Sequence, residues 1–64
     1  MYNFELRRKI KEQFGNYLRF QEATGIHHNL SSMVICGYRK PSGELKARFA
    51  EALGCSIREI FPEN

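Results

Sequence analysis

Residues 20–37, FQEATGIHHNLSSMVICG, contain the most informative pattern of the chain. A helical run ends in it at Gly25, because glycine adopts the left-handed conformation that terminates a helix without a Cβ penalty. Ile26 follows as an apolar residue that can hold the turn against a core, and a second helical run covers residues 27–36. Two helices joined by a short turn containing glycine are typical of a helix-turn-helix motif, which we expect at about residues 16–36.

Capping residues divide the rest of the chain into further helices. Side chains that favour helix N-caps precede the helices expected over residues 4–14, 17–24 and 43–53, namely Asn3, Asn16 and Ser42. The spacing of Ser56 and Glu59 predicts a capping box at the start of a short fifth helix that ends before Pro62. No alternation of apolar and polar residues is long enough for a strand. The sequence therefore predicts an all-α bundle of five short helices.

Apolar spacing within the helices predicts which side chains form the core. The expected inward residues are Leu6, Ile10, Phe14, Phe20, Ala23, Leu30, Met33, Val34, Leu45, Phe49, Ala52 and Leu53. Ser31 and Ser32 are expected on the outer side of the third helix. Ile35 lies about 100° around that helix from Val34, so at least one of the two is expected to be exposed.

Length and charge limit the classes of function. With 64 residues and a formal net charge of +3, the chain is expected to form one domain, residues 1–64, that favours anionic partners. No apolar run approaches the roughly 18 residues of a membrane span, and the N-terminus has no signal-peptide pattern, so we expect a cytoplasmic protein without a membrane partner. A chain of this size has little room for an enclosed catalytic pocket. No nucleophile is paired with a base, and we therefore expect no enzyme.

The cysteine and histidine residues do not predict a metal or a disulfide. Cys36 and Cys55 are the only cysteines, and without a secretory signal both are expected to be free thiols. His27 and His28 are neighbours in the sequence and point about 100° apart on a regular helix, so they cannot ligate one ion together. The usual paired ligand spacings are also missing. We expect neither metal nor cofactor.

A further set of motifs lies in residues 37–62, GYRKPSGELKARFAEALGCSIREIFP. It resembles the second half of Cro/CI-type (XRE-family) helix-turn-helix domains, in which Asn-Gly, a basic pair, Pro-Ser, a Leu-x-x-x-x-Ala-x-Ala-Leu-Gly-Val-Ser run and a final Leu-Phe-like pair follow one another. The matching positions here are Arg39-Lys40, Pro41-Ser42, Leu45, Ala50, Ala52-Leu53-Gly54-Cys55-Ser56 and Ile60-Phe61. The resemblance implies a lambda-repressor-like fold and a repressor-like regulator of transcription from a phage or prophage.

The helix-turn-helix itself departs from the pattern of this family at a few positions. Gln21 stands where a small alanine is usual, Thr24 and Ser31 stand where larger apolar residues are usual, and Cys36 often corresponds to asparagine. A small residue at position 21 lets the two helices approach each other. We therefore expect the Gln21 side chain either to reach solvent or to splay the helices.

The resemblance also implies which residues contact DNA. The start of the third helix would face the edges of the bases. The residues in question are His27, His28, Asn29, Ser32 and Met33. Phosphates would be contacted by the start of the second helix and by the basic loop, through Asn16, Tyr17, Tyr38, Arg39 and Lys40. Asn29 is the strongest candidate for base reading, because a side-chain amide pairs with adenine N6 and N7.

The leading hypothesis is sequence-specific binding to double-stranded DNA at an operator half-site. A homodimer on a palindromic operator would use the C-terminal helix or form only on DNA, and no small-molecule substrate is expected. The alternative is a protein-interaction module that keeps the fold and has lost base reading. A third interpretation is that the chain is one domain of a longer protein.

Overall fold

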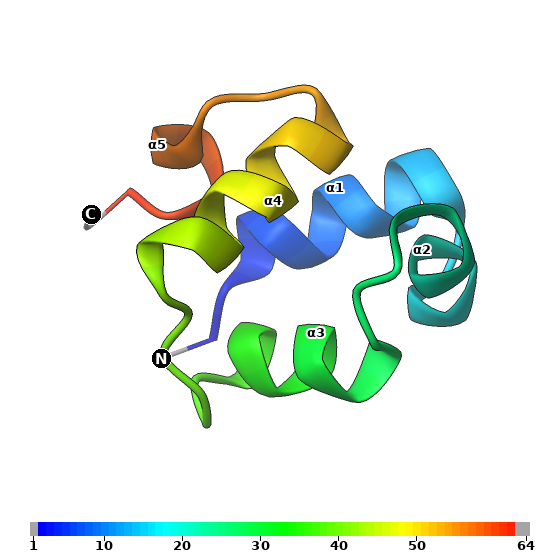
Figure 1. Cartoon of the computed structure of the whole chain (residues 1–64), viewed down its shortest axis with the longest axis horizontal. Helices are drawn as coiled ribbons and strands as arrows, with labels where there is room; N and C mark the ends of the chain where they lie inside the picture. The colour runs from blue at the N-terminus through cyan, green and yellow to red at the C-terminus, as the bar shows by residue number, and fades with distance from the viewer. Residues whose placement is uncertain (1, 63–64) are drawn as a thin grey trace.

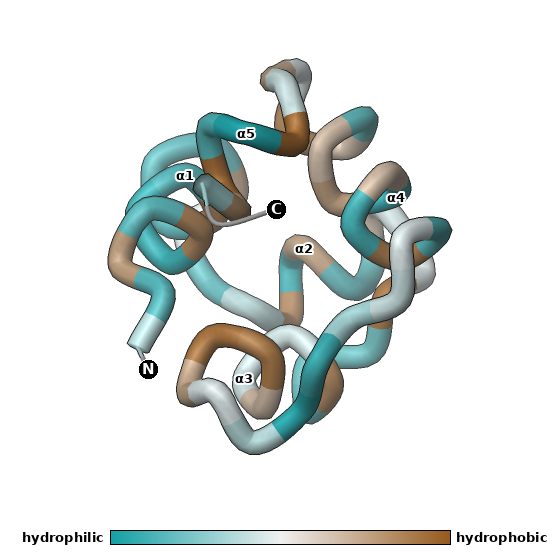
Figure 2. The backbone as a smooth tube through the Cα atoms, turned by 90° about the vertical axis from the view of Figure 1, so that its left-hand side faces the viewer, coloured by the Kyte–Doolittle hydropathy of each residue, from teal (hydrophilic) through white to brown (hydrophobic). Residues whose placement is uncertain are grey.

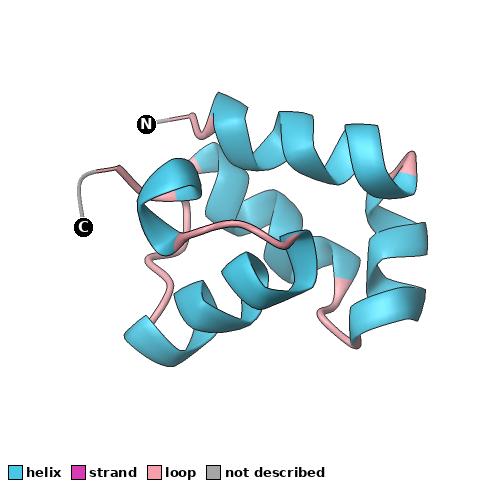
Figure 3. Ribbon diagram, turned by 90° about the horizontal axis from the view of Figure 1, so that it is seen from above, coloured by secondary structure: helices cyan, strands magenta, loops and turns pink. Residues whose placement is uncertain are grey.

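The computed structural model describes residues 2–62, which form five helices and the turns and loops that join them. The helices are α1 (Phe4–Phe14), α2 (Tyr17–Thr24), α3 (His28–Cys36), α4 (Gly43–Leu53) and α5 (Ile57–Ile60). No strand occurs among these residues (Figure 3). The predicted all-α fold of five short helices is confirmed. The start of α3 lies one residue later than expected, because His27 is its N-cap.

The second and third helices are joined by a short turn at the place where the sequence predicts a helix-turn-helix. A turn of three residues, 25–27, joins α2 to α3, and Gly25 adopts the left-handed conformation with a φ of 79°. In Figure 1, α2 is seen nearly end-on while α3 lies in the plane of the view, so the two helices cross. The same view places α3 along one edge of the molecule, with α1 and α4 on one side and no other described helix beyond it.

Local side-chain caps start most of the helices as predicted. The caps are the side chains of Asn3, Asn16 and Ser42. Each accepts a hydrogen bond of 2.8–3.1 Å from the backbone N–H group three residues later in the sequence. The capping box at Ser56 and Glu59 was predicted wrongly, since the Ser56 side chain makes no capping hydrogen bond. Glu59 lies instead 3.8 Å from the ammonium group of Lys9 on α1.

The core gathers apolar side chains from all the helices and from the turn between α2 and α3. Its members are Leu6, Ile10, Phe20, Ile26, Val34, Ile35, Phe49, Ala50, Leu53 and Ile60. The rings of Phe20 and Phe49 are nearly parallel, with centroids 5.8 Å apart, and Phe14 meets Phe20 edge-on at 5.0 Å. Predicted core positions on α1, α2, α3 and α4 are therefore confirmed at Leu6, Ile10, Phe20, Val34, Phe49 and Leu53.

At three positions on α2 and α4 the burial of the side chain differs from the burial that the sequence predicts. Ala23 is exposed and lines a shallow depression between α2 and α4, because these helices do not pack closely there. On α4, Ala50 is buried while Ala52 is only half-buried. The buried face of α4 is thus turned slightly from the face that the apolar spacing predicts.

On α3 the buried face is wider than predicted. Val34 and Ile35 are both buried, so the expectation that one of them is exposed was wrong, and Met33 is 39% exposed. The reason lies at the start of α1, where the Asn3 backbone N–H donates to the Ile35 carbonyl at 2.7 Å. This contact brings the start of the chain over the last turn of α3 and covers Ile35.

Ser31 is the one buried polar side chain in the core of the described residues, although it was expected on the outer side of α3. It is fully buried, and its hydroxyl has no hydrogen-bond partner among the described residues. A buried hydroxyl without a partner loses its interaction with water and gains nothing in return. Ser31 therefore lowers the stability of the fold.

We predict that Ser31→Ala raises the free energy of unfolding by about 1 kcal/mol, because it removes this desolvated hydroxyl at little cost in packing. Urea denaturation followed by circular dichroism measures the change. The neighbouring half-buried Ser32 supplies the control, since Ser32→Ala should shift stability by less than about 0.5 kcal/mol. Destabilisation by Ser31→Ala would mean that the hydroxyl has a partner in solution.

Asn3 links three helices at the end of the bundle where the chain begins. Its Oδ1 atom accepts from the Leu6 backbone N–H at 3.0 Å and caps α1. Its Nδ2 group donates to the Ile60 carbonyl of α5 at 2.6 Å, and its backbone N–H donates to Ile35 of α3. One residue thus holds α1, α3 and α5 together.

Asn3→Ala should lower the free energy of unfolding by about 2 kcal/mol, about half from the lost cap and half from the lost bond to Ile60. Asn3→Ser keeps a capping oxygen but cannot reach Ile60, so it should lose about 1 kcal/mol. Urea denaturation of the two variants separates the local cap from the long-range bond. Equal losses in both variants would contradict a separate contribution of the cap.

Candidate nucleic-acid interface

The outer face of α3 presents a stripe of side chains at helical spacing. Asn29, Ser32, Met33 and Cys36 follow one another at intervals of three, one and three residues, and Asn29 and Met33 are exposed. Cys36 was not predicted to belong to the site. Its distance of seven residues from Asn29 was the signal that would have placed it on this face. α3 itself lies along one edge of the molecule, with the other described helices on one side of it (Figure 1).

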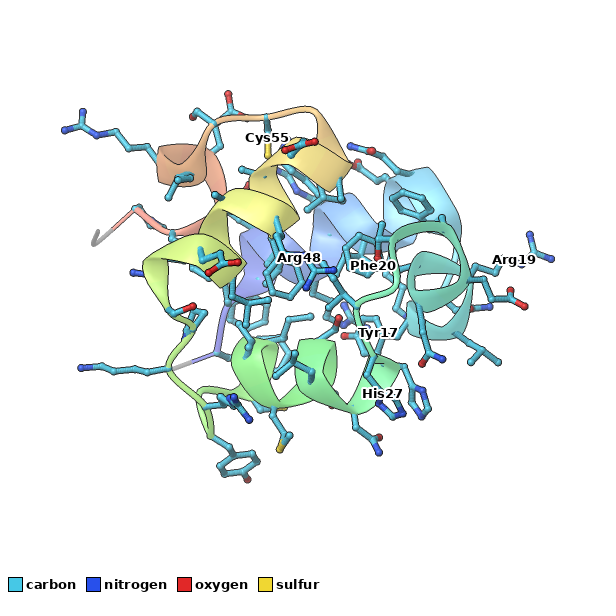
Figure 4. All side chains as sticks on the ribbon, viewed as in Figure 1. Tyr17, Arg19, Phe20, His27, Arg48 and Cys55 are labelled. Carbon is cyan, nitrogen blue, oxygen red and sulfur yellow. The ribbon has the colours of Figure 1, made fainter. Side chains whose placement is uncertain are left out.

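Two histidine rings lie beside this stripe, at the start of α3. His27 is exposed and projects outward from the start of the helix (Figure 4), while His28 is half-buried. The rings stack with centroids 4.5 Å apart and an interplanar angle of 23°. The structure thus brings the five predicted base-contact residues together at one end and along one face of α3.

Gln21 does not follow either of the expected arrangements. Its side chain is half-buried, and its Oε1 atom accepts from the His28 backbone N–H at 2.9 Å. The same oxygen lies 2.7 Å from Nδ1 of the His28 ring. The amide from α2 therefore caps α3 across the turn, and this is how the helices accommodate a residue larger than alanine. The sequence does not predict this role of Gln21, because the role depends on a contact between two helices.

These hydrogen bonds assign opposite tautomers to the neutral forms of the two rings. A carbonyl oxygen only accepts, so Nδ1 of His28 carries the proton toward Gln21 and Nε2 is left as an acceptor. Nδ1 of His27 accepts from the Asn29 backbone N–H at 3.1 Å, so its proton lies on Nε2. The stacked rings consequently offer one donor, from His27, and one acceptor, from His28.

The basic loop after α3 is fixed to the end of that helix. The backbone N–H groups of Tyr38 and Arg39 both donate to the Met33 carbonyl, at 2.9 and 3.3 Å. Tyr38 is 85% exposed, and Arg39 and Lys40 are also exposed. Neither of these two cations forms an ion pair with another described residue. Their charges are available to an anionic partner.

The start of α2 holds the other predicted phosphate contacts. Asn16 is exposed and uses Oδ1 to cap the helix, which leaves its NH₂ group free to donate. Tyr17 is half-buried, with the Lys11 ammonium 5.2 Å from its ring centroid. Burial raises the pKa of the Tyr17 phenol, so the hydroxyl remains a donor at neutral pH. No hydrogen bond among the described residues joins Asn16 or Tyr17 to α3 or to the basic loop.

Other kinds of site find no support in residues 2–62. No group of three or more His, Cys, Asp or Glu side chains is arranged to hold a metal ion there. Cys36 and Cys55 are free thiols, as predicted, and burial raises the pKa of the Cys55 thiol. None of the helices in this part of the chain has the length and apolar character needed to cross a membrane.

Comparison with known proteins gives no match: no family model fits the chain, and no curated protein or solved structure is significantly similar to it.

We predict that Gln21→Ala lowers the free energy of unfolding by about 1 kcal/mol, because α3 loses its cap from α2. Imidazole ¹⁵N NMR should show that His28 loses its preference for the Nδ1–H form, while His27 keeps its tautomer. Gln21→Glu retains the accepting oxygen and should restore the signature of His28. An unchanged His28 signal in Gln21→Ala would contradict the positioning role of Gln21.

Proposed function

We propose that the protein binds double-stranded DNA in a sequence-specific manner and acts as a repressor-like regulator of transcription of the Cro/CI (XRE) type. The observation that carries this proposal is the uncovered outer face of α3 within a helix-turn-helix, with Asn29 and Met33 exposed on it. A helix presented in this way fits the major groove of B-DNA. α3 would enter the groove of an operator half-site with its first turn foremost.

Base reading would fall to the first turn of α3 and to the stripe beside it. Asn29 is exposed and suits the N6 and N7 atoms of adenine. The Nε2–H group of His27 suits an acceptor such as guanine O6 or N7, and Nε2 of His28 suits an exocyclic amine. Ser32 would add a hydroxyl contact, and Met33 would pack against a thymine methyl group.

Phosphate contacts would hold the duplex in register. Arg39 and Lys40, with Tyr38 beside them, are supplied by the loop at the end of α3, and Asn16 and Tyr17 are supplied by the start of α2. The first N–H groups of a helix also favour an anion through the helix dipole. These contacts add affinity that depends on salt but does not depend on sequence. The net charge of +3 supports attraction to DNA in the same way.

We further propose that two copies act on a palindromic operator in the cytoplasm. Half-sites read by a helix-turn-helix dimer lie about 34–36 Å apart, one turn of DNA. The dimer would form through the C-terminal helix α5 or only on DNA. The proposal includes no catalytic role, cofactor, membrane contact or small-molecule substrate.

A second candidate function is a protein-interaction module built on the same scaffold. It is favoured by the composition of α3, HNLSSMVIC, which has neither arginine nor glutamine to read bases. Met33 and Cys36 give the outer face of α3 a partly apolar character. Such a module would show no salt-dependent affinity for duplex DNA.

Titration of ¹⁵N-labelled protein with a mixed-sequence duplex at low salt tests between these functions. DNA binding predicts amide shifts confined to residues 16–17, 27–33 and 38–40 that disappear as salt is added, because phosphate contacts release counterions. The absence of shifts would contradict DNA binding and favour a protein partner. Shifts limited to α1 would show that the helix-turn-helix is only a scaffold.

Once a preferred sequence is found, two substitutions separate base reading from phosphate contact. Asn29→Ala should cost about 1–3 kcal/mol on that sequence and little on others, whereas Lys40→Ala should weaken all sequences and reduce the salt slope by about one. Arg48→Ala, which removes an exposed cation on α4 outside the proposed contacts, is the charge control and should leave the affinity unchanged. Equal losses for Asn29→Ala on every sequence would disprove its assignment as a base reader.

A further inference from the structure

A groove of about 610 Å³ opens at the end of the bundle where the chain begins. It lies between the start of α1, the loop from α3 to α4, and the segment that follows α5. Figure 2 looks onto this end and shows the strongly hydrophilic stretch of the loop running between α3 and α4. Apolar side chains make up much of its lining, those of Tyr2, Phe4, Val34, Pro41, Phe61 and Pro62. The groove lies at the opposite end of α3 from the histidine pair.

Aromatic residues at the mouth of the groove are exposed to an unusual degree. Phe4 is 70% exposed although it is the first residue of α1, and its ring lies 4.6 Å from that of Tyr2. Phe61 is half-buried and meets the core ring of Phe49 at 6.2 Å. Adjoining exposed apolar side chains on a small protein mark a contact surface, and aromatic residues are enriched in protein interfaces.

The charge around the groove is positive and only partly neutralised. Arg39, Lys40 and Lys46 line it, and Arg39 and Lys40 have no ion-pair partner among the described residues. Among the described residues that line the groove, the acidic one is Glu5, and its carboxylate is already paired with Arg8 at 2.5 Å. An occupant that meets this surface without repulsion carries negative charge.

We propose that this groove docks an acidic segment of a partner protein. A leucine or phenylalanine of the segment would rest on the apolar lining beside Phe4, and its carboxylates would reach Arg39 and Lys40. A second copy of the chain fits less well, since two identical grooves would bring the same cations face to face. Single-stranded nucleic acid would use only the rings of Tyr2, Phe4 and Phe61, whereas the aliphatic lining of Val34, Pro41 and Pro62 favours an apolar peptide side chain.

Binding of the acidic segment does not require that the protein bind DNA, but the two proposed surfaces share residues. Arg39 and Lys40 line the groove and are also the proposed phosphate contacts of the basic loop. A bound acidic segment would therefore compete with DNA for these two cations. The competition rests on the proposed function, whereas binding of the segment does not.

The first experiment titrates ¹⁵N-labelled protein, without DNA, with a peptide of about 12 residues that has leucine or phenylalanine at every third or fourth position and glutamate elsewhere. The same peptide with lysine in place of glutamate is the control. We expect amide shifts at residues 2–5, 37–41 and 61, and a dissociation constant at least about tenfold lower for the acidic peptide. Added salt should weaken the binding, because charge attraction is screened.

Matched variants locate the site on the surface. Phe4→Ser should weaken binding about tenfold by removing an aromatic anchor. Leu18→Ser, at a residue that is 55% exposed on α2, should leave it unchanged. Arg39→Gln should also weaken binding, whereas Arg19→Gln serves as the charge control, since Arg19 points away at the far end of the molecule (Figure 4). Because these side chains are exposed, thermal melts should show that all four variants stay folded.

Several results would overturn the docking site. They are equal binding of the lysine peptide, indifference to Phe4→Ser, tighter binding of an oligothymidylate at the same amides, and shifts of these amides with protein concentration alone. A protein that binds the acidic peptide at the groove but binds no duplex DNA would contradict only the proposed function. Binding of both with no mutual displacement would contradict only the competition.

Discussion

The hydrogen bonds of Asn3 hold together the end of the bundle on which both candidate surfaces depend. Through its side chain and its backbone, this residue connects the start of α1 to Ile35 at the end of α3 and to Ile60 at the end of α5. A small domain has a small core, so a few polar contacts of this kind contribute a large share of its stability. The same contacts fix the last turn of α3 and, with it, the basic loop.

The other end of α3 is fixed by an amide from a different helix. Gln21 of α2 accepts from the backbone of His28 and orients its ring, and His27 caps the next N–H group. α3 is therefore held at its start by α2 and at its end by the segment before α1. Fixing a helix at both ends leaves its outer face free for a ligand while the positions of the side chains stay defined.

The proposed DNA surface and the groove meet at the loop between α3 and α4. Arg39 and Lys40 belong to the loop that directly follows α3, and both also line the groove. An anion bound at either surface can therefore reach these two cations. A chain of 64 residues has little surface to divide between partners. Sharing two cations between DNA and an acidic protein segment would let one partner regulate the binding of the other.

The helices and most of their ends follow from local sequence, because a capping contact or a turn at Gly25 involves residues only a few positions apart. The sequence also indicates the exposed basic loop and the polar first turn of α3. The contact of Gln21 with His28, the burial of Ser31 and the covering of Ile35 arise from the packing of the helices against one another. These features depend on which helix lies against which, and the pattern within one helix carries no information about its neighbours.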